Sequence, residues 1–188
     1  MAVPGWRHWT VAWPPLYKIG MDTQPDALLF ARLDALGIAH KTYDHAAVFT
    51  VEEAAALYHS QPGGHTKNLF LKDRKDGLWL VVCRDELRVD LNALSKALDA
   101  PRFSFGSAEL LVATLGVTPG SVTPFSIIND TANKVRVVLD EGMFAFDVLN
   151  FHPLRNDRTT AIASADLPKF LRACGHEPLI AKIPERQA

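Results

Sequence analysis

The feature that most constrains the fold is a pair of apolar runs joined by a short turn that contains glycine. The runs are HTKNLFLKD (residues 65–73) and LWLVVCRD (residues 78–85). Two such runs around a turn predict a β-hairpin. The sequence QPGG at residues 61–64 predicts a turn just before the first strand. Lys67 and Asn68 therefore stand at the mouth of an apolar strand, where they either hold a ligand or face solvent.

Helical patterns occur on both sides of this hairpin. Leucines on one face predict a helix over about residues 25–36, which Gly37 would end. A second helix is predicted over about residues 50–59, because Thr50 and Glu53 form a capping box. Further helices are predicted after three N-cap residues, which are Asp90, Ser107 and Ser164.

Strand patterns are interspersed with these helices. Residues 38–45, 134–141 and 144–153 each predict a strand, and the Pro/Gly-rich residues 117–130 predict a loop that passes into another. The order lacks the strict alternation of a doubly wound sheet. We therefore predict one α/β (α+β) domain with a mixed sheet of six or seven strands and surrounding helices.

The expected domain spans residues 22–182. Residues 1–21 hold three of the four tryptophans without a clear period and are interpreted as an N-terminal extension outside the fold. Residues 183–188 are interpreted as a C-terminal tail. No apolar run reaches the roughly 18 residues that a membrane span needs, so no membrane partner is expected. The two cysteines lie outside any paired pattern, and a cytoplasmic protein is expected.

Charge and motif content narrow the function classes. The formal net charge of −1 means that a nucleic acid would have to bind a local basic patch. Cys83 and Cys174 lie far apart and outside any CxxC pattern, which is typical of packing thiols. The absence of HExxH, GxSxG, GxxxxGK[ST] and GxGxxG motifs weighs against metallohydrolases, serine hydrolases and NTPases. Neither a metal nor a cofactor is expected.

Three features remain that can carry chemistry. The first is the pair Lys67 and Asn68, and the second is the sequence GSVTP, Gly120 to Pro124, whose backbone N–H groups can face a cleft and hold an oxyanion. The third is His152, between a predicted strand and a proline. Residue types alone leave the alternatives open: a solvated lysine, a common loop spacing and a turn histidine.

Several long phrases together resemble one known family. TKNLFLKD, LWLVV, GVTPGSVTPFSIIND, VLNFHPL and TTAIASADLPKFLRACGHEP match, in order and spacing, the YbaK/ProX superfamily of aminoacyl-tRNA deacylases. The resemblance runs from about Asp22 to Ile180. It is closest to the freestanding prolyl-tRNA editing proteins called PrdX or ProXp-ala, which are similar to the insertion editing domain of bacterial prolyl-tRNA synthetase. The tryptophan-rich leader is a departure from the family pattern.

This resemblance implies trans-editing, which is the hydrolysis of alanine mischarged onto proline tRNA. A cysteinyl-tRNA(Pro) deacylase of the same superfamily is one alternative. A catalytically inert domain that binds tRNA or a synthetase is another. The expected partner is the acceptor end of mischarged tRNA(Pro), and prolyl-tRNA synthetase is a further candidate partner.

The family pattern maps onto specific positions of this sequence. It implies a catalytic set of Lys67, Asn68, Gly120 and His152. The expected substrate-binding residues are Ser121, Val122, Thr123 and Pro124, with Phe49, Leu69 and Val122 as pocket walls because each lies beside a site segment. Ordinary core packing is the alternative for these apolar residues. The expected mechanism is substrate-assisted and independent of metal.

Basic residues are enriched in the first half of the chain. A weak tRNA-binding patch is predicted from six of them, which are Lys41, Lys72, Arg74, Lys75, Arg84 and Arg88. The alternative is that most are solvated charges.

Overall fold

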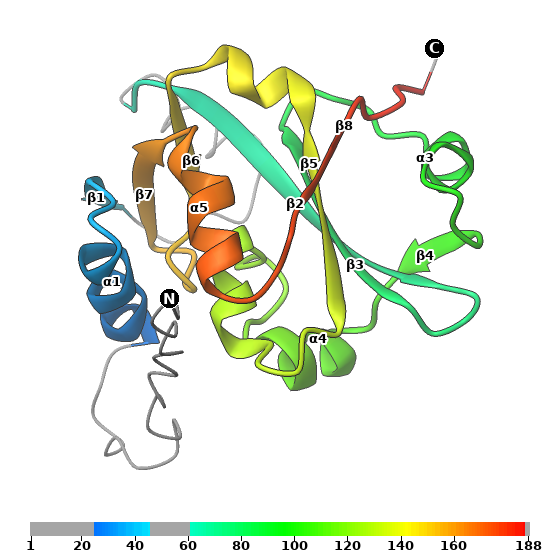
Figure 1. Cartoon of the computed structure of the whole chain (residues 1–188), viewed down its shortest axis with the longest axis horizontal. Coiled ribbons are helices and arrows are strands. Elements are labelled where there is room, and N and C mark those ends of the chain that lie inside the picture. The colour runs from blue at the N-terminus through cyan, green and yellow to red at the C-terminus, as the bar shows by residue number, and fades with distance from the viewer. Residues whose placement is uncertain (1–24, 46–60, 187–188) are drawn as a thin grey trace, which may run out of the picture.

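The hairpin predicted from the sequence lies at the centre of the fold. In the computed structural model, which describes residues 25–45 and 61–186, β2 (Gly64–Asp73) pairs antiparallel with β3 (Leu78–Arg84). Six of the seven β3 residues are buried, as expected for a strand covered on both faces. The hairpin crosses the whole molecule, and the other elements are arranged around it (Figure 1).

The sheet is mixed and contains eight strands in the part of the chain that the structure describes. Its order is β1-β7-β6-β2-β3-β5-β8, and β4 pairs with the far end of β2. Pairs β2–β6, β3–β5 and β5–β8 are parallel and the others are antiparallel. The other strands are β1 (His40–Asp44), β4 (Phe103–Phe105), β5 (Val135–Asp140), β6 (Val148–Phe151), β7 (Arg158–Ala163) and β8 (Leu179–Ala181). The predicted mixed α/β fold is confirmed, with eight strands instead of six or seven. The strands that the sequence did not predict are β4, β7 and β8.

Helices cover the sheet unequally. One face is covered by α1 (Pro25–Ala35), α4 (Ala108–Leu115) and α5 (Asp166–Ala173), whose apolar side chains join the larger core cluster. The other face carries α3 (Leu91–Ala97) and a smaller cluster. Ile183 lies in that smaller cluster, so the start of the expected tail packs on the domain. No helix in the described ranges is long and apolar enough to cross a membrane.

Helix caps follow the sequence at two of the three predicted positions. The Asp90 carboxylate accepts the N–H groups of Asn92 and Ala93, and the Ser107 hydroxyl accepts the N–H of Leu110. The Ser164 prediction is wrong, because Ala165 occupies the N-cap of α5 and makes no side-chain cap bond. The helix predicted over residues 50–59 lies outside the described residues.

The segment after Pro124 differs from the predicted strand. Residues Pro124–Asn129 form a 3₁₀ helix, η2, with Thr123 as the N-cap. The Thr123 hydroxyl accepts the N–H of Phe125 at 3.3 Å, and proline favours the first helical position. A second 3₁₀ helix, η3 (Glu141–Ala145), occupies the first part of the strand predicted over 144–153, so β6 begins only at Val148.

A buried pair joins the end of η2 to the turn after α5. His176 Nε2 lies 3.0 Å from Asp130 Oδ2, and both side chains are 3% exposed. The same oxygen accepts the N–H of Val135 at 2.7 Å. Burial alone would raise the pKa of Asp130, but the hydrogen bonds from Val135 and His176 outweigh it and lower the pKa.

We predict that Asp130→Asn destabilises the protein in a pH-dependent way. At pH 7 the free energy of unfolding should fall by on the order of 1–3 kcal/mol, because a buried charged partner is lost. Because the pKa of Asp130 is lower in the folded state, its contribution to the free energy of unfolding is complete above the pKa of an unfolded aspartate, about 3.9. That stability is lost as the pH falls through the folded value, so the difference from wild type should shrink there.

Chemical denaturation at a series of pH values measures this difference. The control is Asp99→Asn, at an exposed aspartate whose positive φ of 48° asparagine tolerates. A difference between wild type and Asp130→Asn that is constant down to acid pH would contradict the prediction.

Candidate active site

Two glycines allow the start of β2 to lie very close to β6. Gly63 has a φ of +109°, and a Cβ placed there would lie 2.7 Å from the carbonyl oxygen of Val148. A Cβ on Gly64 would lie 2.6 Å from the Phe146 ring. No larger side chain fits at either position without displacing its neighbours. The Gly-Gly pair is therefore a close-packing device as well as a turn.

Asn150 on β6 completes this junction and was not identified from the sequence. Its side-chain amide donates to the carbonyls of Pro62 at 3.1 Å and Gly64 at 3.3 Å. Its own main-chain carbonyl accepts the Thr66 hydroxyl at 3.2 Å. Asn150 is 4% exposed. The signal that marks it is the burial of an amide inside a strand, and the sequence alone does not show burial.

Asn68 faces the loop that the sequence singled out. Its Nδ2 donates to the carbonyl oxygen of Val122 at 3.0 Å. This acceptor fixes the orientation of the amide, because the reverse orientation would set two oxygens against each other. Asn68 Oδ1 is buried and has no hydrogen-bond partner among the described residues. Such an acceptor is suited to a donor from a bound molecule.

The loop Gly120–Pro124 offers main-chain donors, but fewer than expected. The N–H of Ser121 donates to Thr118 at 3.0 Å, so it is committed to a turn. Within the described residues, no hydrogen bond is found for the N–H groups of Gly120, Val122 and Thr123. Gly120 has a φ of +90°, and a Cβ there would meet only Asn156 at 3.8 Å. Its glycine is needed for backbone conformation rather than for space.

The loop that carries His152 packs beside the Gly120–Pro124 loop. Phe125 and Phe151, which directly follow and precede the two segments, make an edge-to-face contact with ring centroids 5.4 Å apart. Asn156, in the His152 loop, is the side chain nearest to Gly120. The structure thus brings together Asn68, the Gly120–Pro124 loop and the segment of His152, from three distant parts of the sequence.

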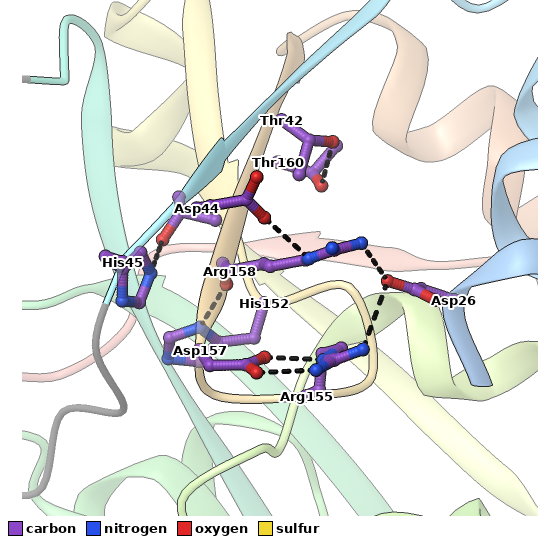
Figure 2. A network of polar contacts seen from close by, with 10 residues as sticks. Asp26, Thr42, Asp44, His45, His152, Arg155, Asp157, Arg158 and Thr160 are labelled. Carbon is purple, nitrogen blue, oxygen red and sulfur yellow. Dashed lines mark hydrogen bonds and ion pairs between the residues drawn. The ribbon is translucent and has the colours of Figure 1, made fainter. Parts of the chain in front are cut away.

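His152 is held as a neutral ring. Its Nδ1 lies 3.0 Å from the carbonyl of Arg158, which can only accept, so Nδ1 carries the proton (Figure 2). Burial lowers the pKa of His152, and the nearby His45 ring, 6.3 Å away between centroids, lowers it further. The Nε2 atom then carries a lone pair, and no partner for it is found in the described ranges.

Ion pairs fix the loop after His152 to the first helix and strand (Figure 2). Asp26 is buried in the first turn of α1 and lies 2.9 Å from Arg158 and 3.9 Å from Arg155. Arg158 also pairs with Asp44 on β1 at 2.7 Å, and Arg155 binds Asp157 through two nitrogens. The network limits the movement of the His152 loop.

Lys67 lies on the other face of β2. Consecutive strand side chains point to opposite faces, and Lys67 and Leu69 line a hollow on the face away from Val122. Lys67 Nζ donates to the carbonyl of Asp85 at 2.9 Å. Leu69 and Val122 therefore do not face each other across one pocket, and Phe49, the third predicted wall, lies outside the described residues.

The six predicted tRNA-binding cations do not lie in one place. Lys41 is on β1 at one edge of the sheet, whereas Arg74 and Lys75 are exposed in the β2–β3 turn. Lys72 pairs with Asp76 at 2.7 Å. Arg84 is engaged by the buried Asp140 at 2.9 Å and by Glu86, while Arg88 is exposed. Lys72 and Arg84 are the least available of the six for a phosphate.

The cysteines lack the character of nucleophiles. Cys83 is fully buried in β3, and burial raises the pKa of its thiol to about 12. Burial also raises the pKa of Cys174. Both thiols stay protonated at neutral pH.

In the part of the chain that the structure describes, no group of three or more His, Cys, Asp or Glu residues could hold a metal ion.

Comparison with known proteins adds the family to this geometry. A model of the aminoacyl-tRNA editing domain matches residues 45–170. That range contains Asn68, the Gly120–Pro124 loop and His152. The chain belongs to the aminoacyl-tRNA editing domain family. This is a family of editing hydrolases, and the resemblance noted in the sequence is confirmed.

Individual relatives of this editing domain agree. The chain is 37% identical over 150 residues to "Prolyl-tRNA synthetase associated domain-containing protein 1" of Danio rerio, covering 79% of this chain and 82% of that protein. It is 32% identical over 157 residues to "Prolyl-tRNA editing protein ProX" of Acetoanaerobium sticklandii, covering 83% and 96%. A solved structure described as a candidate trans-editing enzyme for prolyl-tRNA synthetase shares the fold, with a TM-score of 0.66, 19% identity and coverage of 87% and 99%.

We predict that His152 of this editing domain titrates below the ordinary histidine value of about 6.5. Burial disfavours the charged ring, so the neutral form should persist to lower pH. NMR titration of the imidazole protons measures this, and His152→Gln identifies the resonance. A pKa at or above the ordinary value would contradict the buried, neutral assignment.

Proposed function

We propose that this protein is a trans-editing deacylase that hydrolyses the ester of alanine mischarged onto tRNA(Pro). The observation that supports this best is the contact between Asn68 and Val122. It sets an amide oxygen beside a loop whose N–H groups, like that oxygen, have no partner in the described part of the chain, inside the range that matches the editing family. Acceptors and donors placed together suit an aminoacyl ester, which has an ammonium group and a carbonyl oxygen.

The proposed chemistry depends on positioning and charge stabilisation. An ester is already activated, so neither a metal nor a strong nucleophile is compulsory. The N–H groups of Gly120, Val122 and Thr123 are the candidates that hold the carbonyl oxygen as negative charge develops on it. Water adds to the carbonyl carbon, the bond to the ribose oxygen breaks, and that oxygen takes up a proton.

The attacking water needs orientation. The neighbouring ribose hydroxyl of the substrate guides it, which makes the mechanism substrate-assisted. His152 with its lone pair on Nε2 is suited to accept a hydrogen bond from the water or from the ribose. Lys67, on the other face of β2, neutralises a phosphate or fixes the terminal adenosine.

Size selection gives the activity its purpose. The aminoacylation site of a synthetase specific for proline cannot exclude the smaller alanine by steric clash. A missing methylene changes the free energy of binding by only about 1–3 kcal/mol. A second, smaller pocket admits alanine and rejects proline. Val122, which is partly buried against the core next to Asn68, is a candidate wall.

The partners follow from this role and from the names of the relatives. The acceptor end of mischarged tRNA(Pro) is the proposed ligand, since one relative is named as a prolyl-tRNA editing protein. Prolyl-tRNA synthetase is a second proposed partner, because the relative from Danio rerio is named for a prolyl-tRNA synthetase associated domain. The proposed location is the cytoplasm, where these molecules meet.

We predict that Asn68→Ala and Lys67→Ala each lower the rate of alanyl-tRNA(Pro) deacylation by about tenfold or more, the scale of one lost positioning contact. Purified variants are incubated with alanyl-, cysteinyl- and prolyl-tRNA(Pro), and remaining aminoacyl-tRNA is measured over time. Lys169→Ala, at an exposed lysine on α5, is the matched control and should retain wild-type rates.

The panel separates the competing functions. Preferential cleavage of cysteinyl-tRNA(Pro) by wild type would identify the alternative deacylase. Cleavage of none of the three substrates would leave a binding domain without catalytic activity. Full activity in folded Lys67→Ala and Asn68→Ala would remove the proposed site.

We also predict that Gly120→Ala lowers deacylation much more than Gly37→Ala. Both glycines have positive φ, +90° and +62°, and neither Cβ would clash, so each change should cost about 1–2 kcal/mol of stability. Only Gly120 positions the main-chain donors. Thermal melts and single-turnover deacylation are compared for the two variants. Equal loss of activity would show that the loop conformation has no special role.

A further inference from the structure

The hollow over the Lys67 face of β2 has the composition of a ligand site. Its volume is about 650 Å³. The lining has three partly buried aliphatic residues, an exposed aromatic ring and two cations, which are Leu69, Val89, Leu91, Phe105, Lys67 and Arg186. Asp90 and Asn92 complete the lining. The hollow lies between β2, β4, the start of α3 and the C-terminal segment.

Phe105 is the most exposed large apolar residue of those described, at 65%. It ends β4 and pairs with Leu71 of β2, which fixes its backbone in the sheet. Phe103, two residues earlier on the same face, is buried against Trp79 in the smaller core cluster. The strand thus packs one ring and presents the next to the hollow. An exposed ring on a rigid strand is a stacking surface for a base.

The Lys67 side chain is held by a hydrogen bond, Arg186 is held at its main chain, and both side chains keep donors for a ligand. Lys67 Nζ uses one donor for the carbonyl of Asp85, and an ammonium group has three. Arg186 is anchored through its main chain, because its N–H donates to Arg88 at 2.6 Å. The adjacent Glu185 forms a bridge with Val89.

The one carboxylate of the lining is already engaged. Asp90 Oδ1 accepts the N–H groups of Asn92 and Ala93, at 2.9 and 3.0 Å, as the cap of α3. The lining therefore has two cations and one carboxylate, and that carboxylate, Asp90, caps the helix. Charge in the hollow favours an anion.

The hollow and the candidate active site begin on two faces of one strand. Lys67 and Asn68 are consecutive residues, so their Cα atoms are about 3.8 Å apart. Along β2, β6 pairs only with residues 64–65 and β4 only with residues 71–73. Residues 66–70 consequently have β3 as their only strand partner in the described part of the chain. The hollow beside Lys67 and the loop that faces Asn68 are therefore adjacent along one strand.

We infer that this hollow binds one nucleotide of the single-stranded 3′ end of the RNA, with its base stacked on Phe105 and its phosphate between Lys67 and Arg186. The inference rests on the proposed function, and it names where the substrate is held beyond its ester. An aromatic face combined with two neighbouring cations suits a nucleotide, since an acidic peptide would not need the ring and an apolar ligand would not need the charges.

The inference can be tested without an activity assay, by measuring the binding of an oligoribonucleotide that ends in CCA and carries no amino acid. Phe105→Ala and Arg186→Gln should each raise its Kd by about tenfold, and Phe105→Trp should restore binding. Leu179→Ala, at an exposed apolar residue on β8, and Lys169→Gln are matched controls that should bind as wild type does. In deacylation, Phe105→Ala should raise KM and leave kcat nearly unchanged.

Each outcome decides the point. Absence of oligoribonucleotide binding, or equal binding by wild type and Phe105→Ala, would overturn the inference. Loss in Arg186→Gln alone would indicate an anion site without stacking, which also overturns it. AMP binding as tightly as the oligoribonucleotide would indicate a free nucleotide instead of RNA. If Phe105-dependent binding is found but no mischarged tRNA is cleaved, the inference stands and the proposed deacylase function fails.

Discussion

The close junction between β2 and β6 is the constraint on which the site depends. Strand β2 belongs to both halves of the sheet, and its parallel pairing with β6 covers only Gly64 and His65. So short a pairing is supported by the approach that Gly63 and Gly64 allow and by the Asn150 amide. If the strands moved apart here, the residues that follow on β2 would lose their register with the loops that they face.

The regular elements could be predicted from the sequence because their signals are local. The β2–β3 hairpin follows from two apolar runs and a turn, and α3 follows from the cap at Asp90. The strand expected after Pro124 was wrong, because an apolar run preceded by proline and a threonine cap suits a 3₁₀ turn equally well. Strands β4 and β8 have three residues each, too few for a periodic pattern.

The site was only partly predictable for a different reason. Resemblance to a family indicated which positions to expect in the site, but not which face each occupies. The period of two along a strand separates Lys67 and Leu69 from Asn68, although all three are neighbours in sequence. Asn150 and Arg186 gave no local signal, since their roles arise from contacts with residues more than 80 positions away.

The alternation of side chains along β2 has a consequence for how such a protein can change over evolutionary time. Asn68 faces the Gly120–Pro124 loop, while Lys67 and Leu69 on either side of it border the hollow with Phe105. Under the proposed function, mutations on one side would alter amino-acid preference and mutations on the other side would alter RNA affinity, independently of each other. A lineage that acquires a new mischarging error would then not need to change the residues proposed to hold the RNA.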